Sequence, residues 1–332
     1  MIEAFMKNKN PPFEITPEIL NAITEIAEQV GKISSIEQFS ANPTLRRKNR
    51  IRAIYGSLAI EQNTLNIEQI TAVLNGKRII APPKDIAEVQ NAYEIYDCMD
   101  TLNPYFIDAL LTAHSIMMRG LTDEVGCFRS RPVGVVNQQG EIVHFGTLPD
   151  YVPKLVYDLL DWIKTSELPM LLKSCVFHYE FELIHPFSDG NGRIGRLWHT
   201  LLLSKWNPLF AWLPIESIVH DHAQEYYEAI NISNEAGEST AFIQFMLSSI
   251  KSSLTEAMNM CDEMIDDVSS NSDRRWGIIH DYLKTHGTIQ NKDVCRLLGI
   301  SSATASRLLY SWVKEERLVR YRNGKTWAYK SR

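Results

Sequence analysis

The sequence predicts a mainly α-helical protein with one small β-hairpin and a separate C-terminal module. Most of the chain places apolar residues at helical spacing, whereas residues 133–147 alternate as β-strands do. The charge also changes along the chain. Residues 273–332 hold 13 Lys and Arg against 5 Asp and Glu, a net formal charge of +8, and the preceding residues hold 21 against 35, a net of −14. This asymmetry indicates that the two parts have different partners.

The composition is that of an ordinary globular protein. The chain has 332 residues, of which 45% are hydrophobic and 22% charged. It holds no run of 18 apolar residues and no apolar region near its N-terminus, so neither a membrane span nor a signal peptide is expected. Five scattered cysteines, an odd number, favour a reducing compartment over disulfides or a zinc site. We therefore expect a cytoplasmic protein without a membrane partner.

The N-terminal part is predicted to be helical. In residues 17–30 the apolar residues recur at helical spacing, with Thr16 as cap and Pro17 in the first turn. Thr44–Arg52 is a basic stretch that leads into another helix, and a solvated helix face explains its charges best. Residues 85–120 predict two more helices, which break at Asn103-Pro104.

The middle of the chain predicts a hairpin followed by two helices. VGVVN and EIVHFG are rich in β-branched residues and flank a Gln-Gln-Gly turn at 138–140. Residues 152–162 and 168–184 then return to helical spacing, and the second of these helices leads directly to His185. His178 and Glu182 lie one turn apart in it. Without a third ligand nearby, we expect them to make a structural hydrogen bond and not a metal site.

Residues 185–196, HPFSDGNGRIGR, join the helix 168–184 to a predicted helix over Arg193–Lys205. Gly190 and Gly192 allow a sharp turn and a close backbone approach to a ligand. Their amides, with that of Asn191, can form a nest of donors at the start of a helix. Free amides and the positive end of the helix dipole at such a terminus suit phosphate. The turn therefore predicts a site for a nucleoside triphosphate.

The side chains of the same segment supply the rest of the chemistry. Arg193 and Arg196 share one helix face and can fork onto phosphate oxygens. Asp189 is placed to hold Mg²⁺, which usually takes one or two carboxylates together with substrate phosphates. His185 can accept a proton from a hydroxyl near neutral pH. A lone Gly-Asn-Gly would be an ordinary turn, but the whole combination favours a functional site.

This string resembles the Fic family signature, H-x-F-x-[D/E]-G-N-G-R-x-x-R, and every specified position matches. The resemblance implies a Fic-type helical core and transfer of AMP from ATP, with Mg²⁺, to a Ser, Thr or Tyr hydroxyl of a target protein and of the enzyme itself. It makes His185 the base and Asp189 the Mg²⁺ ligand. Phe187 would be buried to lock the loop. The phosphates would be held by Gly190, Asn191, Gly192, Arg193 and Arg196.

The resemblance extends over roughly residues 11–250. It implies that the hairpin is a flap, with Val143, His144 and Phe145 as its second strand. Such a flap pairs with an extended target segment through main-chain hydrogen bonds, as in strand addition. Tyr226 and Tyr227 lie where family members place aromatic residues near the adenine, and helix packing is an equally weighted alternative. The resemblance leaves a homodimer open.

Ser57–Asn63, SLAIEQN, resembles the family's inhibitory motif [S/T]-x-x-x-E-[G/N]. The motif implies that Glu61 reaches Arg196 and keeps the ATP γ-phosphate from seating productively. Ser57 and Glu61 match, but Gln62 stands where Gly or Asn is expected. The alternative is that Ser57 and Glu61 are an ordinary pair one turn apart on a helix.

The C-terminal module predicts a winged helix-turn-helix. Residues 276–284, 288–298 and 303–316 are predicted helices, with a turn at 299–302, followed by a hairpin with a type I′ turn at Asn323-Gly324. Its basic charge fits phosphate contact with DNA, whereas dimerisation and target docking are the alternative uses of this fold. The candidate DNA contacts are Ser302, Thr304, Ser306 and Arg307 on the recognition helix and Arg320, Arg322 and Lys325 on the wing.

These observations divide the chain into an N-terminal helical region with the inhibitory motif at 1–110, a catalytic core at 111–261, a polar linker at 262–272 and the winged helix at 273–332. The expected function is adenylylation of a protein, inhibited by Glu61. Two alternatives differ from it. One is transfer of another nucleotide, such as UMP, and the other is a DNA-binding regulator whose core senses nucleotide.

Overall fold

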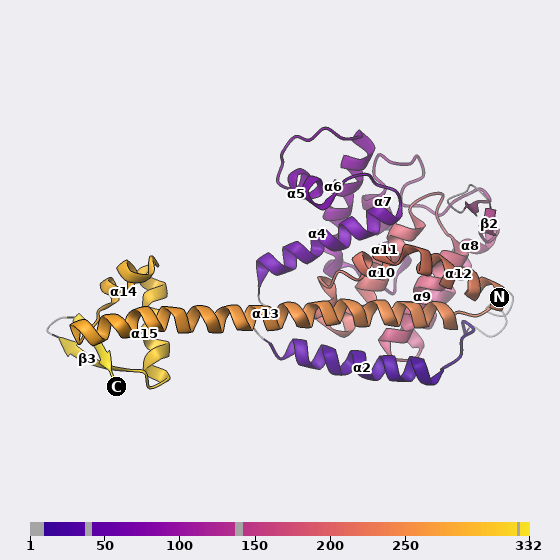
Figure 1. Cartoon of the computed structure of the whole chain (residues 1–332). Coiled ribbons are helices and arrows are strands. Elements are labelled where there is room, and N and C mark those ends of the chain that lie inside the picture. The colour runs from indigo at the N-terminus through magenta and orange to yellow at the C-terminus, as the bar shows by residue number, and fades with distance from the viewer. Residues whose placement is uncertain (1–9, 37–41, 137–141, 324–325) are drawn as a thin grey trace. The chain divides into compact units, whose positions relative to one another are not determined.

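The computed structural model describes residues 10–36, 42–136, 142–323 and 326–332, with the backbone alone for 135–136, 142–145, 261–272 and 323 (Figure 1). The chain divides into two compact units, Met1–Met258 and Asn259–Arg332. Within the described residues no helix is long and apolar enough to span a membrane. The prediction of a mainly α-helical fold with small hairpins is confirmed.

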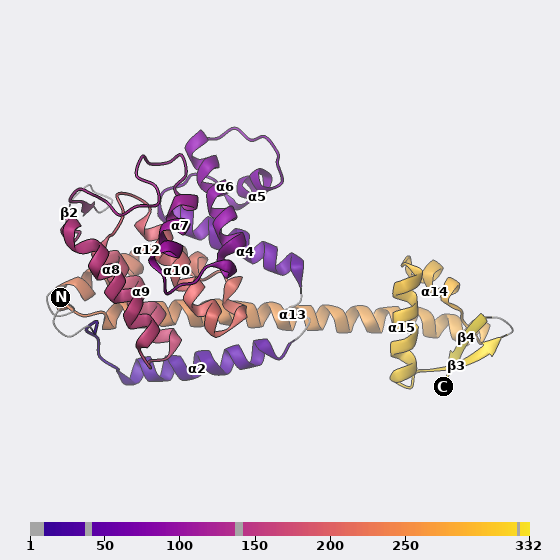
Figure 2. The same cartoon turned by 180° about the vertical axis from the view of Figure 1, so that it is seen from behind.

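The first unit is built from helices around a buried centre. Its helices are α2 (Pro17–Ser34), α4 (Pro43–Ile60), α5 (Ile67–Leu74), α6 (Pro83–Cys98), α7 (Ile107–Met117), α8 (Val152–Thr165), α9 (Met170–Ile184), α10 (Asn191–Trp206), α11 (Ile215–Asp221), α12 (Ala223–Ala236) and the first part of α13 (Thr240–His286), with 3-10 turns at Met99–Thr101, Pro149–Tyr151 and Pro208–Ala211. Figures 1 and 2 show α2 running beside α13 in both views, and the Lys251–Glu25 ion pair joins these two helices.

The N-terminal helices begin where their capping residues predict. The Thr16 hydroxyl accepts a hydrogen bond from the Ile19 amide at 3.3 Å, and Pro17 is the first residue of α2. At α4, Asn42 accepts from the amides of Thr44 and Leu45. In the basic stretch that follows, residues 46–48 are exposed, as expected of a solvated helix face, whereas Arg50 and Arg52 are half-buried and pair with Asp97 and Glu256.

The helices α9 and α10 pack against each other at the centre of the unit. The side chains of α9 are buried on every face, from Leu171 through Ile184, with Glu182 as the partly exposed exception. A helix that is apolar or buried all round lies inside the protein. The loop between α9 and α10 is therefore fixed at both ends by the core, which makes it a rigid platform for residues 185–190.

The predicted hairpin is confirmed. Strands β1 (Gly134–Val136) and β2 (Ile142–Phe145) pair antiparallel, with Gly134 opposite Phe145 and Val135 opposite His144. The register shifts between Val135 and Val136, as at a β-bulge. The predicted turn at 138–140 lies outside the described residues, and of the flap residues Val143, His144 and Phe145 only the backbone is described.

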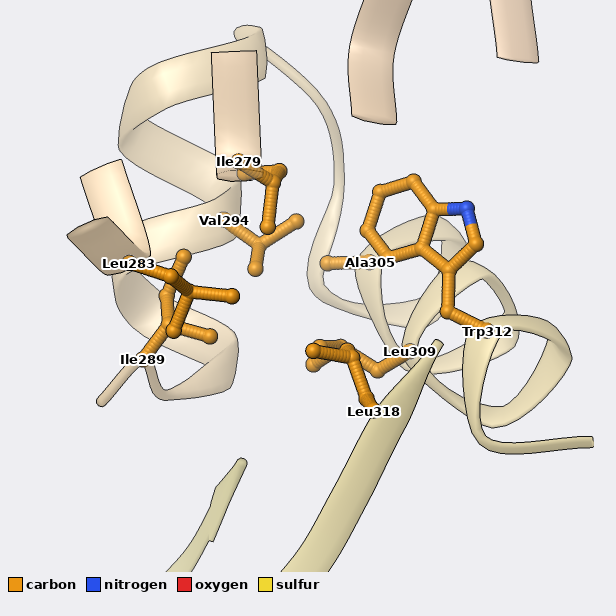
Figure 3. Close-up of a cluster of buried hydrophobic side chains, with 8 residues drawn as sticks. All are labelled: Ile279, Leu283, Ile289, Val294, Ala305, Leu309, Trp312 and Leu318. Carbon is orange, nitrogen blue, oxygen red and sulfur yellow. The ribbon is translucent and has the colours of Figure 1, made fainter. Parts of the chain in front are cut away.

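The second unit contains the end of α13, α14 (Asn291–Leu298), α15 (Ser302–Lys314) and a hairpin of β3 (Leu318–Asn323) with β4 (Thr326–Ser331). Its small core gathers apolar side chains from all of these elements except β4 (Figure 3): Ile279, Leu283, Ile289, Val294, Ala305, Leu309, Trp312 and Leu318. The order of helices and hairpin is the predicted one. Gly299 ends α14 with φ of +64°, as the predicted turn requires.

Three details of this unit differ from the sequence expectations. Residues 262–272, expected as a polar linker or frayed helix end, belong to the continuous helix α13. The helix expected from Thr288 begins only at Asn291, because Ile289 pairs with Tyr329 of β4 and Gln290 then caps α14. Asn323, expected in the turn, is the last residue of β3 and pairs with Thr326, whereas Gly324 of the expected turn lies outside the described residues.

Candidate active site

His185 is held in one orientation at the end of α9. It caps this helix in the left-handed conformation, with φ of +52°, and its amide donates to the Phe181 carbonyl at 2.9 Å. The ring Nδ1 lies 3.3 Å from the Glu182 carbonyl oxygen. A carbonyl only accepts, so this contact places the proton on Nδ1 and leaves Nε2 as the basic nitrogen. The side chain is 18% exposed, so a substrate hydroxyl can approach it.

A buried arginine, Arg129, ties His185 to the base of the hairpin. Its Nε donates to the His185 carbonyl at 2.7 Å, and one terminal nitrogen donates to the carbonyl of Thr147, two residues after β2. Its other terminal nitrogen donates to Arg131. Burial lowers the pKa of Arg129. The guanidinium therefore fixes the catalytic candidate and the hairpin to one point through backbone contacts.

Phe187 locks the loop from inside. Its ring is fully buried and stacks on His114 of α7, with ring centres 3.7 Å apart and an interplanar angle of 7°. Its backbone is closed by Asn191, whose side-chain oxygen accepts from the Phe187 amide at 2.8 Å and whose side-chain nitrogen donates to the Phe187 carbonyl at 2.9 Å. The Asn191 side chain thus closes the loop, and the Asn191 backbone amide is the first amide of α10.

His114 supports the same loop at Asp189. The Gly126 amide donates to His114 Nδ1 at 3.0 Å, so the proton lies on Nε2, which donates to the Asp189 carbonyl at 3.0 Å. Burial lowers the pKa of His114, which keeps the ring neutral as this pair of contacts requires. His114 and Arg129 are positioning residues that the sequence reasoning missed, because no local pattern marks them.

The turn before α10 needs its glycines. Gly190 has φ of +86°, and a Cβ there would meet Met118 Sδ at 2.6 Å. A Cβ on Gly192 would lie 2.4 Å from Glu61 Oε1. The Gly190 amide, expected in the donor nest, donates to Asp189 Oδ1 at 2.6 Å. The first amides of α10 are the remaining candidate donors, and the Glu61 carboxylate lies beside Gly192 at this terminus. A carboxylate is favourable at the positive end of a helix, where a phosphate would also bind.

Glu61 also pairs with Arg196, as the sequence predicts for the inhibitory motif. A terminal nitrogen of Arg196 donates to Glu61 Oε1 at 2.7 Å, and its Nε donates to the Ser57 hydroxyl at 3.2 Å. Arg196 is 3% exposed. Burial lowers its pKa, but Glu61, ahead of Tyr226 and Glu182, more than offsets this and keeps the pKa above its ordinary value. The guanidinium is therefore charged, and a carboxylate occupies it.

Gln62 explains the Gly or Asn of the motif. It has φ of +66° and follows the last turn of α4, where its amide donates to Ala59 and the Asn63 amide donates to Leu58. This is a Schellman motif, whose left-handed residue is usually Gly. Gln62 accepts the same conformation at a cost of about 1–2 kcal/mol. The departure from the motif therefore changes the strain of the turn and leaves Glu61 in place.

Arg193 is held by two carboxylates. Its NH2 donates to Asp189 Oδ1 at 2.9 Å, and its NH1 donates to Glu88 Oε1 at 3.1 Å. Arg193 and Glu88 are buried, whereas the Asp189 side chain is 47% exposed. Glu88 comes from α6, far away in the sequence. It is a further residue of the site that sequence reasoning missed.

The acidic residues can serve a magnesium ion in the way expected from the sequence. No cluster of three or more His, Cys, Asp or Glu fit to hold a metal occurs among the described residues. Mg²⁺ needs none when one carboxylate and substrate phosphates supply its ligands. The exposed carboxylate of Asp189, beside the N-terminus of α10, fits that role.

Comparison with known proteins agrees with this geometry. The sequence profile of the Fic/DOC family matches residues 104–203. The crystal structure of a Fic family protein from Desulfovibrio desulfuricans G20 is 38% identical, covers 97% of this chain and 98% of its own, and superposes with a TM-score of 0.73. This chain belongs to the Fic family.

Curated relatives of this Fic chain carry the name protein adenylyltransferase. Fic-1 of Caenorhabditis elegans is 24% identical over 273 residues, which are 79% of this chain and 51% of the relative. Protein adenylyltransferase Fic of Nematostella vectensis is 28% identical over 58% of this chain and 45% of its own length. The Fic chain thus spans about half the length of the curated relatives it matches.

Of the two tyrosines expected near the adenine, Tyr226 of this Fic chain lies in the core. It is 2% exposed, packs edge-on to Tyr227 and approaches His178 Nε2 with its hydroxyl at 3.1 Å. Tyr226 is therefore a helix-packing residue, which was the alternative considered from the sequence. The prediction of a hydrogen bond between His178 and Glu182 is wrong, since Glu182 Oε1 lies 3.9 Å from His178 Nε2 and Tyr226 occupies that nitrogen instead. Tyr227 is 42% exposed, and burial, with Glu61 as a smaller cause, raises the pKa of its hydroxyl.

In the C-terminal unit the expected DNA contacts fall into two groups. Ser302 and Ser306 bond to the Asn291 side chain, and Thr304 bonds to the cap residue Ser301. The hydroxyls of Ser302 and Ser306 therefore hold α15 to α14, whereas the Thr304 contact lies at the N-terminus of α15 itself. The arginines expected as contacts, Arg307, Arg320 and Arg322, are exposed, and Lys325 lies outside the described residues.

Proposed function

We propose that this chain transfers AMP from ATP to a hydroxyl of a protein, and to a hydroxyl of its own. The observation that carries the proposal is the convergence of His185, the N-terminus of α10 and two buried arginines on one rigid loop. The names of the curated relatives support the same activity. Cooperation of a base with preorganised cations and amides is what an in-line phosphoryl displacement requires.

The reaction follows from the protonation state of His185. Its Nε2 accepts the proton of a Ser, Thr or Tyr hydroxyl, and the hydroxyl oxygen forms a bond to the α-phosphorus of ATP. The bond from the α-phosphorus to the bridging oxygen breaks, and pyrophosphate leaves. The amides of α10, Arg193 and Arg196 stabilise the charge on the phosphates. Mg²⁺, held by Asp189 when bound, would neutralise phosphate charge.

The hairpin β1–β2 is the proposed flap that aligns the target. Its second strand, β2, ends beside Thr147, which is tied through Arg129 to His185. A target segment that adds to the hairpin through main-chain hydrogen bonds would bring its hydroxyl to a fixed distance from the base. Such recognition needs few side-chain contacts, so the flap sequence alone does not specify the target.

We further propose that Glu61 inhibits the reaction. Its carboxylate accepts a hydrogen bond from the Arg196 guanidinium and lies beside Gly192 at the N-terminus of α10. The triphosphate would need both this guanidinium and this helix terminus. A charge-assisted hydrogen bond contributes about 1.5–3 kcal/mol, enough to bias a two-state site. ATP must then displace the carboxylate or bind with its γ-phosphate misplaced, which moves the α-phosphorus out of line.

Intact-mass spectrometry tests the activity. Incubation of the purified chain with ATP and Mg²⁺ is expected to add the mass of one or more AMP groups, whereas UTP would add UMP if the donor were different. The matched control is His185→Ala, which is expected to lose transfer but to bind ATP with nearly unchanged affinity, because the amides and arginines remain. AMP transfer by the purified His185→Ala protein would contradict the role of His185.

For the C-terminal unit we propose a winged helix that contacts the phosphates of duplex DNA. The exposed Arg307, Arg320 and Arg322 and the net charge of +8 over residues 273–332 support it. Arg320 also stacks over Trp327 at 3.6 Å, which holds its guanidinium on the face of the hairpin. Retention on immobilised duplex DNA that falls with salt tests this proposal.

A further inference from the structure

Glu88 is a buried carboxylate that contacts two functional parts of the first unit. Its Oε1 accepts from Arg193 NH1 at 3.1 Å, and its Oε2 accepts from the side-chain nitrogen of Asn63 at 2.8 Å. Its side chain is 5% exposed. Arg193 belongs to the proposed phosphate site, and Asn63 lies two residues after Glu61. The two oxygens of one carboxylate therefore join the catalytic loop to the segment that carries the proposed inhibitor.

The turn at residues 62–64, directly after Glu61, is held to α6 by further contacts. The Asn63 side chain also donates to the Asp85 carbonyl at 3.2 Å, and the Thr64 amide donates to the Asp85 carboxylate at 3.0 Å. Asp85 and Glu88 lie one turn apart on α6 and are both buried. Residues 63 and 64 thus have their polar groups satisfied by α6. Since Gln62 is in a strained left-handed conformation, these contacts are what keep the turn closed.

We propose that Glu88 is a positioning residue with two tasks: it orients Arg193 toward the phosphates, and through Asn63 it holds Glu61 on Arg196. This inference rests on the proposed adenylyl transfer and on the proposed inhibition by Glu61. It assigns to α6 a part in both the active and the inhibited state. In the inhibited state each arginine of the loop is held by a carboxylate from the N-terminal helices, Arg193 by Glu88 and Arg196 by Glu61.

Arg193 would depend most on Glu88 for its orientation when Asp189 binds a metal ion. In the structure Arg193 is shared between Asp189 and Glu88. The half-exposed Asp189 is the proposed Mg²⁺ ligand, and a carboxylate that binds a cation attracts the guanidinium less. Glu88 is buried and contacts the other terminal nitrogen of Arg193, so it keeps its contact. It then holds one edge of Arg193 and leaves the rest for a phosphate oxygen.

The first test uses a double-mutant cycle in the Glu61→Gly background, where the inhibitor is absent. Glu88→Gln is expected to lower kcat/KM for ATP about tenfold, as loss of one charge-assisted contact implies. In a protein that also carries Arg193→Ala, Glu88→Gln is expected to change kcat/KM by less than about twofold, because its partner is gone. An equal loss with and without Arg193 would overturn the positioning role and indicate a purely structural ion pair.

Two companions keep this cycle decisive. Glu88→Asp retains the charge and is expected to restore part of the kcat/KM that Glu88→Gln loses. It also serves as the second variant if a thermal melt shows that Glu88→Gln is not folded. Lys84→Ala is the matched control on α6. Lys84 is exposed, and its Nζ lies 3.9 Å from Glu88 Oε1, so the variant changes the surroundings of Glu88 without removing its carboxylate. It is expected to leave kcat/KM unchanged, and a loss as large as that of Glu88→Gln would contradict a specific role for Glu88.

The second test concerns Asn63. Asn63→Ala in the otherwise unaltered chain is expected to raise AMP transfer about fivefold, the factor for one lost hydrogen bond. In the Glu61→Gly background it is expected to add less than about twofold, because the carboxylate that it positions is absent. No gain in the otherwise unaltered chain, with a clear gain from Glu61→Gly, would overturn the link through Asn63. If Glu61→Gly itself transfers no AMP, the proposed function fails instead, so the two failures are distinguishable.

Discussion

At the scale of single residues, the conformation of Gln62 bears on how firmly the turn after the proposed inhibitor Glu61 closes. The left-handed backbone that Gln62 adopts costs a residue with a Cβ about 1–2 kcal/mol, and glycine adopts it freely. Gln62→Gly should therefore close the turn more firmly and lower basal AMP transfer about fivefold, as seen by initial rates of self-modification. Gln62→Asn is the graded control, since Asn tolerates this region better than Gln. Higher transfer in Gln62→Gly would show that strain at residue 62 does not oppose the inhibitor.

Individual site residues were predictable where one segment carries them. His185, Asp189, Gly190, Gly192, Arg193 and Arg196 lie within twelve residues, and their spacing on one loop and helix fixes their mutual placement. Glu88, His114 and Arg129 reach the same loop from other elements, and each is a single polar residue in an ordinary helix or loop context. The packing of α7 against α10, and of α6 against α7 and α4, brings Glu88 and His114 to the site, so no local pattern could reveal them.

At the scale of elements, α9 carries two carboxyl groups whose burial opposes ionisation. Burial raises the pKa of Glu180 to about 8 from the 4.5 of an exposed glutamate. Burial likewise raises the pKa of Glu182 to about 7, against the opposing effect of Arg196. At these two groups the folded chain therefore binds more protons than the unfolded chain between about pH 4.5 and pH 8, so their contribution to folding stability falls as the pH rises through this range.

Replacement of Glu180 tests whether its buried carboxyl group makes folding stability depend on pH. Glu180→Met removes a buried group that must lose its proton at high pH, so it should stabilise the protein at pH 8 relative to the unaltered chain, by an amount on the order of a few kcal/mol. The difference should shrink toward about pH 5. Urea denaturation at several pH values measures it, with the exposed Glu228→Gln as control. A difference that is constant with pH would mean that Glu180 keeps its charge in the fold.

The helix α2 was predictable from its cap and apolar stripe, whereas α11 and α12 were not predicted. The helix α2 follows its cap residue and its isoleucines, and the hairpin follows its β-branched residues. The sequence reasoning did not predict α11 and α12 as elements, because the stretch from 215 to 236 has neither a side-chain cap nor a clear apolar stripe. Tyr226 was left open between a contact with the adenine and helix packing, and tertiary packing places it in the core.

At the scale of the whole molecule, the charge asymmetry predicts separate functions for the two units. If the exposed arginines of the C-terminal hairpin contact phosphates, Arg320→Glu with Arg322→Glu should abolish salt-dependent retention on duplex DNA. AMP transfer should stay unchanged, because no residue of the proposed active site lies in that unit. Lys77→Glu with Arg78→Glu makes the same change of charge at exposed positions of the first unit and should retain binding. If the unaltered chain is not retained at all, the unit serves protein docking instead.

The order of helices and hairpin in the C-terminal unit was predictable from its composition and turn residues, whereas the join to the first unit was not. Polar and acidic residues at 262–272 suggested a linker, yet they continue α13. Each residue type there tolerates a helix, so composition alone did not decide between a linker and a continuous helix. The predicted division of the chain at 110 and 261 stays a prediction.

The central claim is that the Glu61 carboxylate occupies the place where the triphosphate must bind. It is tested most directly by measuring AMP incorporation into the Glu61→Gly, Glu61→Gln and unaltered proteins at equal ATP and Mg²⁺ by intact-mass spectrometry. Removal of the carboxylate frees Arg196 and the terminus of α10, so Glu61→Gly should incorporate the most AMP. Glu61→Gln should fall between, because it keeps the shape and loses the charge. Equal incorporation by all three proteins would contradict the account, since residue 61 would then be an ordinary residue at the end of α4.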